Sequence, residues 1–143
     1  MFNPSRDQAR QFLIDAWRKR LDALPATPLE TLAADVIALH PEYHALLEAP
    51  DSLERDFSPE DGGINPFLHL SLHLAIEEQL GIDQPPGLRA AFERCQQRHG
   101  NRHDALHDVL ECLGETVFNA QRNRQPPDGA AYVDCVRRRA GMA

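Results

Sequence analysis

A nine-residue pattern, His-x-x-x-His-x-x-x-Glu, occurs three times in the chain and uses six of its seven histidines. Residues four apart on an α-helix lie above one another on one face, so each copy can present two imidazoles and a carboxylate together. Imidazole and carboxylate groups are ligands for transition metals. The pattern therefore favours a helical protein that binds metal. Its copies are His40-His44-Glu48, His69-His73-Glu77 and His103-His107-Glu111.

Helical periodicity continues along most of the chain, and no stretch alternates as a strand does. Proline and glycine separate the helical stretches, and five or six helices with short connections predict an all-α, compact single-domain bundle over residues 1–143. Pro41 interrupts the second helix or starts a short new one, because proline lacks a backbone donor. The expected helices cover residues 5–24, 27–39, 66–81, 88–99 and 101–123, with a last short helix around Tyr132, Val133 and Val136.

The polar, acidic stretch at residues 49–65 is the longest predicted loop, and its length suggests a lid or a binding role. The N-terminus lacks the basic and apolar segments of a signal peptide, and no apolar run is long enough to span a membrane. We therefore expect a cytoplasmic protein. A net charge of -7 argues against nucleic acid or an anionic membrane as a partner. The sequence indicates neither a small-molecule ligand, nor a protein partner, nor an oligomeric state.

The three cysteines, Cys95, Cys112 and Cys135, are widely spaced and form no Cys-x-x-Cys pair. This spacing suggests neither a thiolate zinc site nor a disulfide framework. We expect all three to be small buried side chains in a reducing compartment.

The copy at His69 is the strongest candidate for metal binding. At about 100° per residue, His73, Ile76 and Leu80 fall on nearly the same side of the helix as His69. The two histidines thus lie within the stripe that faces the core. Because a buried imidazole without a partner is costly, they must meet a metal or acceptors from other helices.

The other two copies are weaker candidates. His103 and His107 lie along one edge of the apolar stripe of their helix, with Glu111 continuing that edge. His40 precedes Pro41, a position biased away from helical geometry, so His40 and His44 need not stack one turn apart.

We expect one or two divalent transition metal ions, iron, manganese or zinc. Some of the nine pattern residues are then expected to orient ligands by hydrogen bonds, since one ion takes four to six ligands. The candidate ligands, in descending order, are His69, His73, Glu77, His107, His103, His44, His40 and Glu111.

Five segments along the chain have a distinctive sequence: FNPSR at 2–6, HPEYH at 40–44, NPFLHLSLH at 65–73, DQPPG at 83–87 and LECLGET at 110–116. Together they resemble an uncharacterised bacterial family, domain of unknown function 1841, over nearly the whole chain. The resemblance implies a single-domain bacterial protein. It implies no activity, substrate or catalytic residues.

Two other interpretations are open. The pairs His103-Asp104 and His107-Asp108 each supply the dipeptide of HD-type metal-dependent phosphohydrolases, in which a metal activates water. Alternatively, the protein is a helical adaptor without metal, whose histidines form hydrogen bonds in the core or respond to pH. The sequence does not decide whether the protein is an enzyme.

Overall fold

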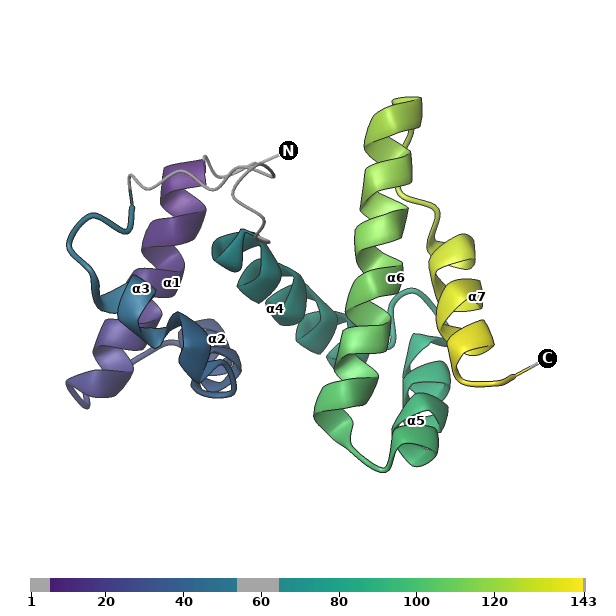
Figure 1. Ribbon diagram of the computed structural model, residues 1–143, viewed down its shortest axis with the longest axis horizontal. Helices are drawn as coiled ribbons and strands as arrows, with labels where there is room; N and C mark the ends of the chain where they lie inside the picture. Colours follow the sequence, from purple (N-terminus) through teal and green to yellow (C-terminus); the bar gives the residue numbers. More distant parts are fainter. Residues whose placement is uncertain (1–5, 54–64, 143) are drawn as a thin grey trace. The chain divides into compact units, whose positions relative to one another are not determined.

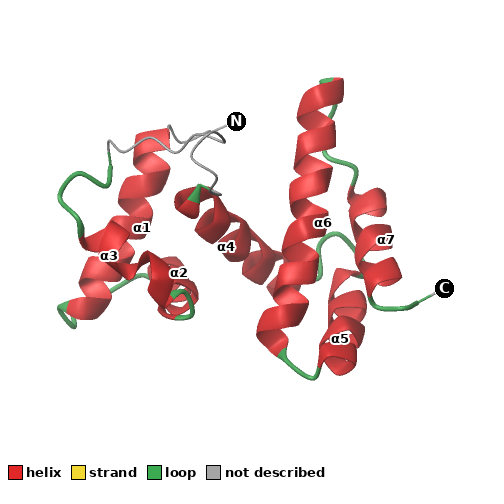
Figure 2. Ribbon diagram, viewed as in Figure 1, coloured by secondary structure: helices red, strands yellow, loops and turns green. Residues whose placement is uncertain are grey.

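The computed structural model describes residues 6–53 and 65–142, and every regular element in these ranges is helical (Figures 1 and 2). This confirms the all-α prediction. The described residues form seven α-helices rather than five or six, and the short helix after Pro41 accounts for the difference. The elements are α1 (Arg6–Leu21), α2 (Pro28–Ala38), the 3-10 helix η1 (Pro41–Tyr43), α3 (His44–Glu48), α4 (Pro66–Ile82), α5 (Leu88–His99), α6 (Arg102–Asn123) and α7 (Gly129–Arg139).

The chain divides into two compact units, residues 1–74 and 75–143, with the boundary inside α4. We describe each unit by itself, and the single-domain organisation stays a prediction. Most of the loop predicted as a lid, residues 54–64, lies outside the described ranges, as does residue 5, where the first expected helix begins. No described helix has the length and apolar character needed to cross a membrane.

In the first unit, α1 packs against α2 and α3 around an apolar core (Figure 1). Helix α2 begins at Pro28 because Thr27 forms a capping box with Glu30: each side chain bonds the backbone N–H of the other residue. Burial of the apolar faces of these helices provides the main stabilisation. The buried core consists of Leu13, Ile14, Ala16, Trp17, Ala33, Val36, Ile37, Leu47, Phe67 and Leu70.

Pro41 ends α2, as its position predicts. His40 has φ -126° and ψ 67°, which is not helical, and η1 starts at Pro41. His40 and His44 therefore lie on different elements, with His44 opening α3. The first copy of the histidine pattern is bent at Pro41, and its two imidazoles do not stack on one helix.

In the second unit, α5, α6 and α7 pack pairwise (Figure 1). Helix α5 ends at His99, and Gly100 after it has a positive φ of 69°, a conformation that glycine adopts readily at helix C-termini. Asn101 and Asp128 cap the N-termini of α6 and α7 through their side chains. The hydroxyl of the buried Tyr132 donates a hydrogen bond to Gln79 at 2.7 Å, which connects α7 with the second half of α4.

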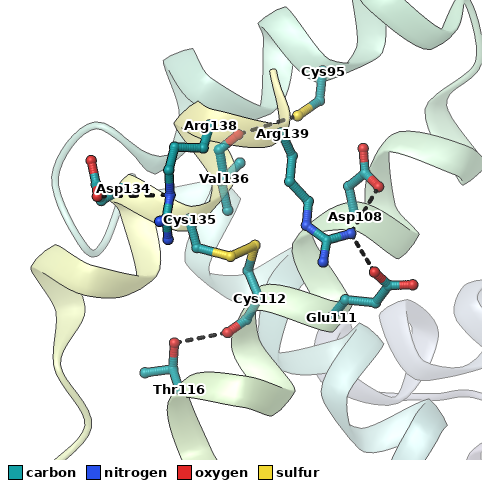
Figure 3. Close-up of a disulfide and its surroundings, with 10 residues drawn as sticks. All are labelled: Cys95, Asp108, Glu111, Cys112, Thr116, Asp134, Cys135, Val136, Arg138 and Arg139. Atoms are coloured by element: carbon teal, nitrogen blue, oxygen red, sulfur yellow. Dashed lines mark hydrogen bonds and ion pairs between the residues drawn. A yellow bond between two sulfur atoms is a disulfide. The ribbon is translucent and has the colours of Figure 1, made fainter. Parts of the chain in front are cut away.

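The cysteines differ from the prediction. Cys112 on α6 and Cys135 on α7 form a disulfide (Figure 3). Only Cys95 is the expected small buried thiol: it donates to the carbonyl of Val136 at 3.6 Å, and burial raises its pKa. The spacing of the cysteines in the sequence did not reveal the disulfide. The bond depends on the packing of α7 against α6, which brings Cys135 next to Cys112. Disulfides are typical of oxidising compartments, so the cytoplasmic location stays a prediction.

Candidate metal centre

His69 and His73 lie one turn apart on the first half of α4, and their ring centroids are 4.8 Å apart. Asn65 fixes the start of this helix, because its side chain accepts from the backbone N–H groups of Phe67 and Leu68. Because each residue of a helix is turned by about 100° from the one before, the position of the helix start determines the face on which His69 and His73 lie. His73 is 2% exposed and His69 is half-buried, in agreement with the predicted core-facing stripe.

His40 joins these two histidines from the end of α2. Its ring centroid lies 4.5 Å from that of His73 and 5.2 Å from that of His69. One ring nitrogen of each of these three residues lies within 4.8 Å of those of the other two. His40 is 3% exposed, so the cluster is largely shielded from solvent. Two non-consecutive segments of the first unit thus bring three imidazole donors together.

The backbone of α2 fixes the orientation of His40. Its Nδ1 lies 2.8 Å from the carbonyl oxygen of Val36, and both groups are buried. A carbonyl only accepts hydrogen bonds, so Nδ1 carries the proton and neutral His40 has its lone pair on Nε2. A hydrogen bond from one ring nitrogen to a backbone carbonyl is the usual arrangement that orients the other nitrogen towards a metal.

Tyr43 lies beside the three histidines. Its ring is stacked on His40 at 5.8 Å and meets the edge of His69 at 5.7 Å. Burial, followed by the charge of Glu42, raises the pKa of the Tyr43 hydroxyl. Sequence reasoning missed this residue, although it stands directly before His44 inside the first copy of the pattern.

His44 and Glu48, the other members of the first copy, contact α1 and α2 instead. The Nε2–H of His44 donates to the carbonyl of Ile37 at 2.8 Å, and its ring packs 4.4 Å from that of Trp17. Glu48 accepts a hydrogen bond from Trp17 Nε1 at 3.2 Å. These contacts hold α3 against α1 and α2, and they give Glu48 a structural role.

The third copy lies on α6. His103 and His107 are half-buried, and their ring centroids are 4.3 Å apart. Glu111, one turn further, is exposed and forms an ion pair with Arg139 of α7. The two imidazoles thus lie one turn apart on one face of α6, as their spacing predicts, and their rings meet edge to face.

Glu77, the highest-ranked carboxylate, forms an ion pair with Arg102 at 2.6 Å. The carboxylates of the second and third copies are therefore both neutralised by arginines. This reduces the negative charge that each offers to a cation. Sequence reasoning did not identify these partners, because each ion pair joins two different helices.

The donor set suits a metal ion. With Zn–N distances of about 2.0–2.1 Å, two nitrogens of a tetrahedral site lie about 3.3 Å apart. The nitrogens of His40, His69 and His73 lie within 4.8 Å of one another, so closing the site requires a contraction of at most about 1.5 Å. Rotation of the imidazole rings about their side-chain torsions can supply it. Neutral imidazoles suit zinc and iron, whereas manganese favours oxygen ligands.

The described part of the chain is thus an all-α protein with a buried cluster of three histidines at the end of α2 and the start of α4. The chain belongs to the DUF1841 family, a domain of unknown function, whose family model matches residues 5–138. This confirms the resemblance found in the sequence. Neither a curated protein nor a solved structure matches the chain.

Proposed function

We propose that this protein binds a divalent transition metal ion, iron, manganese or zinc, through His40, His69 and His73. The convergence of one nitrogen from each of these histidines to within 4.8 Å carries the proposal. Burial supports it further, because imidazoles removed from water lose hydration that a coordinated cation replaces. The bond from His40 to Val36 supplies the orienting hydrogen bond that metal-binding histidines typically make.

Three histidines provide one ion with three of its ligands. Catalytic zinc sites have this arrangement: three protein ligands hold the ion, and water or substrate occupies the fourth coordination position. His107, which the repeated pattern also puts forward as a ligand, lies in the second unit, and its role stays a prediction of the sequence. A second ion would need carboxylates, and the ion pairs of Glu77 and Glu111 with arginines favour one ion over two.

Cobalt is a suitable probe of this site, because Co²⁺ absorbs visible light when bound and can replace zinc. Untagged protein freed of metal by chelation is titrated with Co²⁺. We expect saturation at one ion per chain, with a visible spectrum typical of nitrogen ligands. His73→Leu should abolish the spectrum. His99→Gln serves as the matched control, since His99 pairs with Asp108 at 2.6 Å and is not one of the three proposed ligands.

Among the residues that the structure describes, no contact favours the phosphohydrolase interpretation over metal binding alone. Asp108, which the second His-Asp dipeptide would supply as a ligand, is engaged by His99 at 2.6 Å and by Arg139 at 3.5 Å. Metal-loaded protein screened against phosphomonoesters and phosphodiesters tests this alternative directly. A protein that takes up no metal under any loading condition would instead be the helical adaptor.

A further inference from the structure

The disulfide forms part of the wall of a cavity between α6 and α7. This cavity has a volume of about 290 Å³, and both Cys112 and Cys135 line it. All residues that line it belong to the second unit. A volume of this size lies just below the range of about 300–1,000 Å³ for small-molecule sites. The disulfide thus borders a space close in volume to that of a small compound.

The two sulfur atoms differ in access. Cys112 is fully buried, whereas Cys135 is half-buried on α7. In thiol–disulfide exchange, a thiolate attacks one sulfur in line with the bond and expels the other. A compound in the cavity therefore reaches Cys135 more readily, and Cys112 is the leaving group. We do not expect Cys95 to attack the disulfide, because its thiol is buried and donates a hydrogen bond to the Val136 carbonyl.

The remaining lining is mostly polar and carries both signs of charge. Arg138 supplies a cation, Glu115 and Asp128 supply anions, and Asn119 and Asn123 supply amides. The guanidinium of Arg138 is 3.9 Å from Asp134 and 70% exposed, so it is available to an anionic group (Figure 3). Such a lining fits a small zwitterionic compound with a carboxylate and an amine. It gives no preference to an apolar one.

We propose that this cavity is a thiol-exchange site, at which a small zwitterionic peptide thiol reduces the Cys112–Cys135 disulfide. The incoming thiolate bonds to Cys135 Sγ and breaks the Cys112–Cys135 bond, and the Cys112 thiolate then takes up a proton. A second thiol attacks the mixed disulfide, releasing an oxidised dimer of the small thiol and leaving Cys135 as a thiol. Overall, two small thiols lose two electrons and two protons, which the protein disulfide gains.

Wild-type protein incubated with reduced glutathione tests the accessibility of the bond. We expect reduction, followed by trapping of new thiols and mass measurement, to proceed faster than global unfolding at the same temperature. Unfolding is measured separately by circular dichroism after a denaturant jump. Reduction no faster than unfolding would overturn the proposal, because the bond would then react only in the unfolded chain.

Two matched variants test the direction of attack. With oxidised glutathione, Cys112→Ser should form a mixed disulfide on Cys135, whereas Cys135→Ser should leave buried Cys112 unmodified. Equal modification of both, or modification of Cys112 alone, contradicts the assignment. If either variant does not fold, peptide mapping of the transient mixed disulfide in rapidly quenched wild-type protein gives the same answer.

Substitution of Arg138 tests whether the cavity prefers a zwitterionic thiol to an uncharged one. Arg138→Gln should slow the reaction with glutathione about five-fold, as expected for the loss of one exposed charge pair, and leave the reaction with 2-mercaptoethanol unchanged. Arg122→Gln, also on the surface but outside the cavity lining, is the control. Equal rates for Arg138→Gln and wild type with glutathione would overturn the zwitterionic specificity.

Discussion

The Nδ1–H of His40 donates to the carbonyl oxygen of Val36 at 2.8 Å, one turn earlier in the chain. This bond ties the histidine cluster to the last turn of α2, and it fixes the ring through the backbone rather than through a side chain. His44 makes a similar bond to Ile37 with its Nε2, but its ring packs on Trp17. The two histidines of one motif therefore have different roles.

This difference predicts opposite outcomes for two equivalent substitutions. His40→Gln should weaken metal binding at least about ten-fold, because it removes an oriented donor. His44→Gln should change the affinity by less than about three-fold, since the Ile37 bond and not a metal occupies its Nε2. Competition with a chromophoric chelator measures both affinities. A larger loss of metal affinity in His44→Gln than in His40→Gln would contradict the assignment of His40, and not His44, as a ligand.

The capping box at the start of α2 should contribute measurably to stability. Thr27→Ala removes the acceptor for the Glu30 N–H at 3.1 Å and should lower the free energy of unfolding by about 1 kcal/mol. Thr31→Ala, at an exposed position on the same helix, is the control and should not destabilise the protein. Urea denaturation followed by circular dichroism compares the two. Equal free energies of unfolding for Thr27→Ala and wild type would argue against the cap.

Glu30 also predicts a dependence of stability on pH. Its hydrogen bond to Lys19 at 2.6 Å, together with the Thr27 backbone N–H, lowers its pKa below the ordinary value of 4.5. Because the folded state holds the carboxylate in its charged form, this stabilisation is present above pH 4.5 and is lost as the pH falls through the lowered value. Glu30→Gln should therefore make unfolding less sensitive to acid.

Thermal unfolding of Glu30→Gln and wild type across this acidic range checks the prediction. Glu93→Gln, at an exposed position of α5, provides the comparison for removal of a carboxylate elsewhere. Parallel pH profiles for wild type and Glu30→Gln would contradict a role for the Lys19 contact.

The disulfide should stabilise the second unit. It joins residues 23 positions apart, and a loop of this length is expected to contribute about 3 kcal/mol, mainly by restricting the unfolded chain. Reduction with dithiothreitol should lower the free energy of unfolding by that amount, as measured by urea denaturation. The double variant Cys112→Ser, Cys135→Ser is the control, and the reductant should not affect it. A reduced wild type as stable as the oxidised protein would contradict this contribution.

Local signals in the sequence predicted the helices well. Pro28, Asn65-Pro66 and Gly100 mark helix ends through local backbone chemistry, and the structure places ends there. The direction of His73 followed from helical periodicity alone, because the stripe it shares with Ile76 and Leu80 must be buried. These features depend on neighbours in the chain.

Features that depend on tertiary packing were not predictable in the same way. The pairing of Cys112 with Cys135 requires α7 to lie against α6, and neither helix encodes this by itself. The ion pairs of Glu77 and Glu111 with arginines on other helices also arise from packing. His40, ranked low because of Pro41, enters the cluster since the break at Pro41 turns its ring towards α4.

Elemental analysis of untagged protein, purified from cells supplied in turn with iron, manganese and zinc, tests the central claim most directly. Wild type and His99→Gln should carry one metal ion per chain with at least one of these metals. The double variant His69→Leu, His73→Leu should carry none, with circular dichroism confirming that it remains helical. If that variant does not fold, His69→Gln and His73→Gln give the same comparison. Wild-type protein without stoichiometric metal under every condition, or folded variants that retain it, would contradict a metal site at His40, His69 and His73.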